Sequence, residues 1–113
     1  MSIRVDPDHL AEHADLRPFA YIVTIGPNDP AFRVHVVAAT VTVRGANVSC
    51  ERVGNSTRRN IEANSSVTVV WPPVPNGEAG SYDHYTLIAD GWGSVRGDSV
   101  DVSIDAAILH RPA

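Results

Sequence analysis

A run of polar residues in the middle of the chain has the types and the spacing that could bind an anion: Asn55, Ser56, Thr57, Arg58 and Arg59. The run follows a strand-like segment that ends at Gly54, and its amide and hydroxyl side chains can cap the start of a short helix. Free N–H groups at a helix start favour a phosphate, hydroxyl groups hydrogen-bond to its oxygens, and guanidinium groups neutralise its charge. The same residues also fit a solvated surface helix, and both interpretations stay open at this point.

Two other motifs give weaker evidence of a functional site. His9, Glu12 and His13 match the H-x-x-E-H pattern of one zinc protease class, but a third ligand and a larger body are missing, so we expect no metal site. Cys50 lies in a strand pattern with no His nearby in the sequence, which favours a buried thiol over a nucleophile. No catalytic residue can be identified from the sequence.

Composition restricts the function further. The chain has 113 residues, of which 43% are hydrophobic, so we expect a single domain over residues 1–113. The formal charge of -4 gives no overall basic field, which argues against nucleic acid and anionic membrane partners. The single cysteine and the absence of an apolar signal-like start at Met1 predict a cytoplasmic protein.

Hydrophobic periodicity predicts a mainly β fold. A short N-terminal helix is expected over residues 9–16, and a second short helix between the third and fourth strands. The second strand is unusually long and is expected to bend near Thr40, as barrel strands do, and the glycines that flank Trp92 predict a bulge or a close backbone approach. Six strands are expected: 20–25, 32–43, 48–53, 67–71, 82–95 and 99–104, the last continuing less regularly to His110. The pattern predicts a small closed or split barrel, with an unassigned loop over residues 72–81.

The chain resembles the pyridoxamine 5'-phosphate oxidase superfamily of split β-barrels. The most specific part is the run from Asn60 to Asn64, Asn-Ile-Glu-Ala-Asn, which leads into the strand Val-Thr-Val-Val-Trp-Pro at residues 67–72. The resemblance implies a six-stranded split barrel, a homodimer, and FMN, or alternatively the deazaflavin F420, bound at the subunit interface. Related members bind haem or biliverdin, so haem is a less favoured third cofactor.

The resemblance also implies which residues contact the cofactor. The phosphate-binding element of the family matches Ser56, Thr57, Arg58, Arg59 and Asn60. In the oxidases that give the family its name, an Arg-Lys pair binds the FMN phosphate, and here hydroxyl side chains occupy those two positions while the charge lies at the next two residues. Trp92 is predicted to lie beside the cofactor, because a large aromatic side chain positioned by a bulge can stack on a planar ring.

Three functions remain open. The first is an FMN- or F420-dependent oxidoreductase that acts on an unknown small molecule, in which the cofactor ring transfers hydride. The second is a non-catalytic protein that binds a flavin, haem or another tetrapyrrole. The third is a dimeric scaffold without a cofactor.

Overall fold

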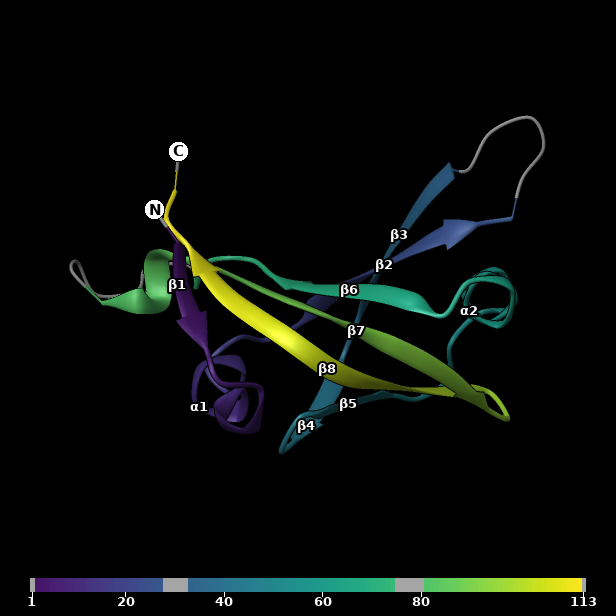
Figure 1. Cartoon of the computed structure of the whole chain (residues 1–113), viewed down its shortest axis with the longest axis horizontal. Coiled ribbons are helices and arrows are strands. Elements are labelled where there is room, and N and C mark those ends of the chain that lie inside the picture. Colours follow the sequence, from purple (N-terminus) through teal and green to yellow (C-terminus); the bar gives the residue numbers. More distant parts are fainter. Residues whose placement is uncertain (1, 28–32, 75–80, 113) are drawn as a thin grey trace.

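The computed structural model describes residues 2–27, 33–74 and 81–112, which form a curled antiparallel sheet with short helices at its ends (Figure 1). The strands are β1 (Ser2–Val5), β2 (Ala20–Gly26), β3 (Arg33–Ala39), β4 (Val41–Arg44), β5 (Asn47–Cys50), β6 (Ser66–Trp71), β7 (Thr86–Arg96) and β8 (Ser99–His110). The α-helices are α1 (Ala11–Ala14) and α2 (Asn55–Ala63), and 3-10 turns cover Pro7–His9 and Tyr82–His84.

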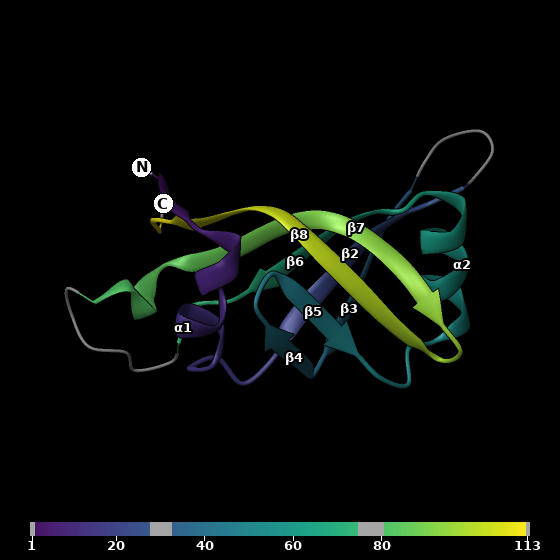
Figure 2. The same cartoon turned by 60° about the horizontal axis from the view of Figure 1, so that its bottom comes forward.

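The bent strand curls the sheet into a split barrel. The hydrogen-bonding order is β3-β2-β6-β7-β8-β5-β4, with β1 paired to β8, so β3 and β4 lie at opposite ends of this order. Only Thr40 separates these two strands in the sequence. One edge of the sheet must therefore lie next to the other, and Figure 2 shows β4 and β5 passing beneath β7 and β8.

The barrel class agrees with the sequence prediction, but the expected count of six strands was wrong. The described residues form eight strands, because the long second strand breaks at Thr40 and because β1 pairs with the end of β8. β1 has only four residues, too few to show an alternating pattern, and its register with β8 runs from Ser2 opposite His110 to Val5 opposite Ala107. Phe32, where the second strand was expected to begin, lies outside the described residues.

The N-terminal helix is shorter than the sequence suggests. The Asp6 side chain accepts a hydrogen bond from the N–H group of Asp8 (3.0 Å) and starts the 3-10 turn, and α1 then adds four residues. Ala14, the last residue of α1, is buried, and so is Leu10, the residue that precedes the helix. These two side chains close the end of the barrel core, as a cap over one end of the sheet.

The core lies inside the curl of the sheet. Alternate residues of β6, β7 and β8 point inward and are almost completely buried: Val67, Val69, Trp71, Leu87, Ala89, Ala107 and Leu109. Ile61 of α2 joins this cluster. Burying one such aliphatic side chain is worth about 1.5 to 3 kcal/mol, so this interior holds the two halves of the barrel together.

A buried arginine secures the chain on both sides of the unassigned loop. Arg17 is 7% exposed, and its guanidinium group donates hydrogen bonds to the carbonyl oxygens of His13, Pro72, Tyr82 and Tyr85 at 2.7 to 3.2 Å. Burial lowers the pKa of Arg17, and the nearby Asp83 opposes that shift. The loop predicted over residues 72–81 thus has fixed flanks, while residues 75–80 lie outside the described residues.

The predicted irregularity near Trp92 is confirmed as a bulge. The register between β7 and β8 shifts between Asp90, which faces Ala106, and Gly91, which faces Ile104. A side chain at Gly91 would place its Cβ atom 2.0 Å from the carbonyl oxygen of Ser103. Only glycine fits there, because the backbone of β8 occupies the space that a Cβ atom needs.

Gly91→Ala should therefore destabilise the fold by at least about 2 kcal/mol, because the alanine methyl group collides with backbone rather than with a movable side chain. Urea unfolding followed by tryptophan fluorescence measures the change. Gly54→Ser is the control, since no atom lies within 4 Å of a Cβ at that position and the change should stay within about 0.5 kcal/mol. Equal unfolding midpoints for the two variants would refute the steric argument.

Candidate functional site

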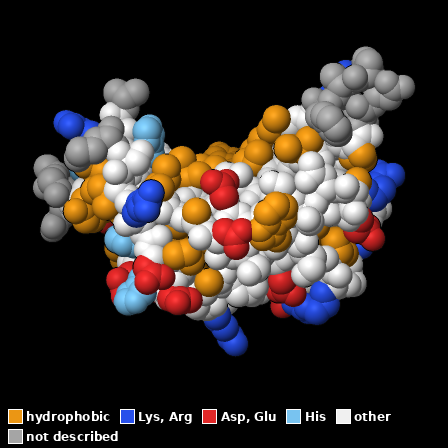
Figure 3. All heavy atoms as spheres, viewed as in Figure 1, with side chains coloured by type: hydrophobic (Ala, Val, Ile, Leu, Met, Phe, Trp, Pro, Cys, Tyr) orange, Lys and Arg blue, Asp and Glu red, His pale blue; other side chains and the backbone are white. Residues whose placement is uncertain are grey.

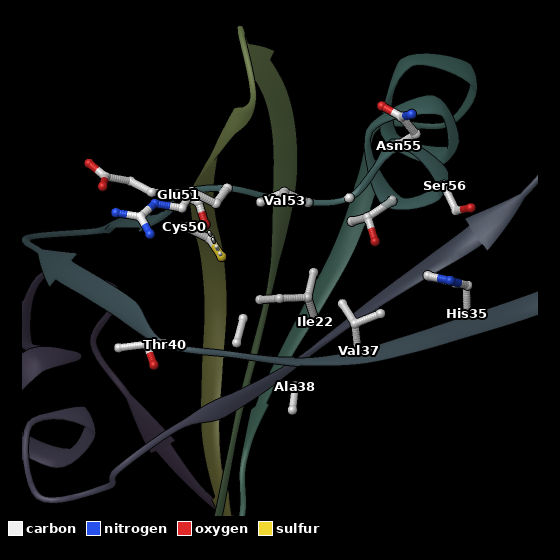
Figure 4. Close-up of a pocket in the computed structure, with 14 residues that line it drawn as sticks. Ile22, His35, Val37, Ala38, Thr40, Cys50, Glu51, Val53, Asn55 and Ser56 are labelled. Atoms are coloured by element: carbon white, nitrogen blue, oxygen red, sulfur yellow. Dashed lines mark hydrogen bonds between the residues drawn. The ribbon is translucent and has the colours of Figure 1, made fainter.

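A hollow of about 650 Å³ lies between β3 and the segment that connects β5 to α2, and we call it the central hollow. Figure 4 shows its floor, where Ile22 and Val37 lie across from Cys50 and Val53. The rim is more polar and includes Thr40, Glu51, Arg52, Asn55, Ser56 and Thr57. The volume is in the range of small-molecule sites, and an apolar floor with a polar rim suits a flat organic ligand.

A second hollow of about 460 Å³ lies at the start of α2, and we call it the helix-start hollow. Its lining includes the side chains of Arg33, Ser56 and Arg59. His35 and Ser56 line both hollows, so the two adjoin. Two guanidinium groups and a hydroxyl group can bind a phosphate or a carboxylate, and such an anion would lie next to the apolar space of the central hollow.

The start of α2 differs from the sequence prediction. Gly54 is the N-cap residue, with extended φ and ψ angles of -65° and 161°, and no side chain caps the helix. Asn55, Ser56 and Thr57 are the first three helical residues, not the cap. The amide of Asn55 instead accepts a hydrogen bond from Arg58. An uncapped helix start leaves its N–H groups available to an anion.

The two consecutive arginines make different contacts. Arg59 lines the helix-start hollow. Arg58 donates one hydrogen bond to the carbonyl oxygen of Gly97 (3.2 Å) and another to the side chain of Asn55. Both residues line a small hollow with Asn55 and Glu62, but only Arg59 also lines the helix-start hollow. Arg58 secures α2 to the turn between β7 and β8.

Thr57 and Asn60 lie on the buried face of α2. Thr57 is 2% exposed and lines the central hollow, and Asn60 is 8% exposed and lines the helix-start hollow. The Asn60 Nδ2 atom donates a hydrogen bond to the Thr24 hydroxyl group at 3.1 Å, and Thr24 is completely buried in β2. The structure thus brings together Ser56, Thr57, Arg59 and Asn60 at the two hollows.

Trp92 lies apart from these residues. Its side chain is 55% exposed, and its Nε1 atom donates a hydrogen bond to the Asp105 carboxylate. In the sheet, Trp92 faces Ser66 on one side and Ser103 on the other. It is not among the residues that line the central or the helix-start hollow. That Trp92 lies beside a cofactor stays a prediction, because the structure contains one chain and the predicted cofactor site lies between two subunits.

Sequence reasoning did not assign two residues of the site, Arg33 and His35. Both belong to β3, where alternation places Arg33, His35 and Val37 on one face of the strand. The His35 Nδ1 atom is buried and has no hydrogen-bond partner among the described residues. The alternation was visible in the sequence, but nothing there showed that this face of β3 lies opposite the start of α2.

The described residues include no group of three or more His, Cys, Asp or Glu side chains placed to hold a metal ion. Nor does the described part of the chain contain a helix with the length and apolar character needed to cross a membrane.

No protein-family model matches the chain. Two curated proteins do match it: Mb0449c from Mycobacterium bovis and MT0457 from Mycobacterium tuberculosis, both described as uncharacterized proteins. Each is 33% identical over 131 aligned positions, which cover 97% of this chain and 82% of the relative.

Solved structures resemble the fold at low sequence identity. HupZ from Group A Streptococcus has a TM-score of 0.66 at 12% identity and covers 87% of this chain and 90% of its own. A candidate pyridoxamine 5'-phosphate oxidase from Listeria innocua has a TM-score of 0.62 at 12% identity and covers 91% of this chain and 96% of its own. HutZ, the haem storage protein from Vibrio cholerae, has a TM-score of 0.53 at 15% identity and covers 91% of this chain and 90% of its own.

Cys50 gives a chemical test of the central hollow. Burial raises the pKa of the Cys50 thiol, and the carboxylate of Glu51 adds to the shift, so the reactive thiolate is scarcer than in an unfolded chain at the same pH. We expect iodoacetamide to alkylate the native protein at least about tenfold more slowly than the urea-unfolded protein at pH 8. Mass spectrometry measures this rate without background, because the chain has one cysteine.

The sign of the shift also sets a pH dependence of stability. Because folding raises the pKa of the Cys50 thiol, the folded state favours the protonated thiol. The stability that this preference adds to the fold is fully present below the ordinary thiol pKa, and it is lost as pH rises through the raised pKa of the folded protein. Native and unfolded alkylation rates that coincide at pH 8 would contradict the buried position of Cys50.

Proposed function

We infer a function from one premise: the chain belongs to the family of the mycobacterial proteins Mb0449c and MT0457, and its fold is the split barrel of the pyridoxamine 5'-phosphate oxidase-like superfamily. We propose that it binds FMN, or alternatively F420, along β3 and the start of α2. We further propose that the bound cofactor exchanges hydride with a small molecule. The observation that carries this proposal is the junction of a cationic hollow with an apolar one.

The residues present fit such a cofactor. Its phosphate would lie in the helix-start hollow, beside the guanidinium groups of Arg33 and Arg59 and the hydroxyl group of Ser56. Its ring would lie in the central hollow, where the side chains of Ile22, Val37 and Val53 exclude water from one face. The usual Arg-Lys pair is absent at Ser56 and Thr57, but Arg33 and Arg59 supply two charges from different elements. When bound, a flavin or deazaflavin ring supplies the hydride chemistry.

We also propose a homodimer. One face of β2, β3 and β6 points away from the core and carries apolar side chains, among them Val34 (69% exposed), Val36 (53%) and Tyr21 (37%). We call this the outer face, and Figure 3 shows apolar side chains gathered along the hollowed upper edge of the molecule. Soluble monomers rarely expose large contiguous apolar patches, so a second copy is the expected cover.

A second candidate function is binding of haem or another tetrapyrrole without turnover. The structural likeness to the haem storage protein HutZ and the partnerless Nδ1 atom of His35 favour it. A cofactor-free scaffold is the third candidate. Absorbance spectra of the purified protein, before and after adding FMN, F420 or haem, separate the three, because each ligand has its own spectrum and a scaffold changes none of them.

The separation of the two arginines of α2 gives a sharp test of the phosphate position. Arg33→Gln and Arg59→Gln should each weaken FMN binding about 10- to 100-fold, since a hydrogen bond to a charged group is worth about 1.5 to 3 kcal/mol. Arg58→Gln is the matched control and should leave the affinity within about threefold, because its guanidinium group contacts Gly97 and Asn55.

Isothermal titration of FMN into each variant measures these affinities. A loss at Arg58 that equals the loss at Arg59 would place the phosphate elsewhere on α2. Tight binding by all three variants would remove the phosphate site altogether.

The homodimer has its own test. Val36→Glu puts a charge at the centre of the outer face and should convert the dimer to a monomer, because burying an unpaired carboxylate costs several kcal/mol. Sedimentation velocity at about 20 µM checks the state, where an association of micromolar strength is visible. Glu62→Gln, on the exposed side of α2, is the control. A parent protein that sediments as a monomer, or a Val36→Glu variant that stays dimeric, would refute the assigned interface.

A further inference from the structure

A third hollow, of about 570 Å³, lies outside the two hollows assigned to the cofactor. Three arginines line it, Arg44, Arg52 and Arg96, and we call it the arginine groove. Its floor is the outward side of the hairpin formed by β4 and β5, where Thr42 faces Ser49 and Arg44 faces Asn47. The lining thus combines guanidinium groups with the Thr42 hydroxyl group and the Asn47 amide, all of which can donate a hydrogen bond to an oxyanion, whereas the Ser49 hydroxyl group donates its proton to Asp101.

Two of the three arginines have no partner of their own. Neither Arg44 nor Arg52 makes a hydrogen bond or an ion pair within residues 2–27, 33–74 and 81–112. Arg96 pairs with Asp101, with 3.0 Å between Nε and Oδ2, and Asp101 also accepts a hydrogen bond from the Ser49 hydroxyl group at 2.7 Å. These hydrogen bonds lower the pKa of Asp101, so it stays charged and holds Arg96 in place.

The charge of the groove opposes that of the chain. Three guanidinium groups stand against two carboxylates, Glu51 in the lining and Asp101 paired with Arg96, so the groove stays net positive while the whole chain has a formal charge of -4. Clustered arginines repel one another unless an anion lies between them, and their planar forks match the two oxygens of a carboxylate or a phosphate. The groove is therefore a locally cationic surface on an acidic protein.

The groove also opens toward the proposed cofactor site. Thr40, Glu51 and Arg52 line both the arginine groove and the central hollow, so the two spaces adjoin. Arg52 has a φ angle of 57°, in the left-handed region that costs a non-glycine residue about 1 to 3 kcal/mol. This conformation redirects the chain from β5 toward α2 and places Arg52 at the junction.

We propose that the arginine groove binds the carboxylate or phosphate group of the second reactant, whose reactive part reaches the central hollow past Thr40 and Arg52. The inference rests on the proposed function for the role of the central hollow. The site would have two cationic ends: Arg33 and Arg59 for the cofactor phosphate, and Arg44, Arg52 and Arg96 for the substrate. The substrate class is a small organic acid or a phosphate ester.

Nuclear magnetic resonance of the ¹⁵N-labelled protein tests the groove with simple probes, succinate and inorganic phosphate, each titrated with and without FMN. Saturable shifts are expected at the amides of Thr42 and Ser49 and at the Nε–H groups of the groove arginines, with dissociation constants below about 10 mM. The double variant Arg44→Gln/Arg52→Asn should bind at least tenfold more weakly. Asparagine accepts the left-handed backbone at residue 52, so the fold should persist. Arg111→Gln, at an exposed arginine outside the groove, is the control for the loss of a surface charge.

The outcomes separate this inference from the proposed function. If succinate binds more strongly than phosphate, the second reactant is an organic acid, and if phosphate binds more strongly, it is a phosphate ester. Either result supports anion binding in the arginine groove. FMN shifts at residues 56–60 report the cofactor site independently, so anion binding without FMN binding would support the groove and overturn the proposed function. The groove itself is overturned if neither probe gives saturable shifts at Thr42 and Ser49, or if the double variant binds as tightly as Arg111→Gln.

Discussion

The packing of α2 against the sheet is the constraint on which the candidate site depends. Ile61 fits over Gly93, where an added Cβ atom would lie 3.0 Å from the Ile61 Cγ2 atom, and the N–H group of Gly93 donates a hydrogen bond to the carbonyl oxygen of Ser65 at 2.7 Å. The buried hydrogen bond from Asn60 to Thr24 fixes the rotation of the helix about its axis. Leaving such a buried polar group unpaired costs about 1 to 3 kcal/mol, so the helix has one stable orientation. That orientation turns Ser56 and Arg59 toward β3 and Arg58 away from it.

The bent strand provides the other half of the site. β3 presents Arg33, His35 and Val37 to the start of α2, and after Thr40 the same chain continues as β4 and presents Arg44 to the arginine groove. The three hollows therefore follow one continuous stretch of backbone, cationic at both ends and apolar in the middle. A phosphate-bearing planar cofactor and an anionic second reactant together match this order of charges.

Much of the architecture could be predicted from the sequence because it depends on local patterns. The strands β2 and β6, the bend at Thr40 and the bulge near Trp92 all follow from residue types within a few positions. β1 was missed because four residues show no periodicity, and its pairing with β8 joins the two ends of the chain. The roles of Arg58 and Arg59 could not be separated either, because the direction of each depends on how α2 packs on Gly93 and Thr24. Arg33 and the arginine groove required the same long-range contacts.

In the proposed function, the helix-start hollow binds the phosphate of a flavin-type cofactor. Comparing FMN with riboflavin by titration tests it directly, because the two ligands share the ring and differ in the phosphate. We expect FMN to bind the parent protein at least about 100-fold more tightly than riboflavin, because two guanidinium groups would contact the one phosphate. Equal affinities for the two ligands would contradict it.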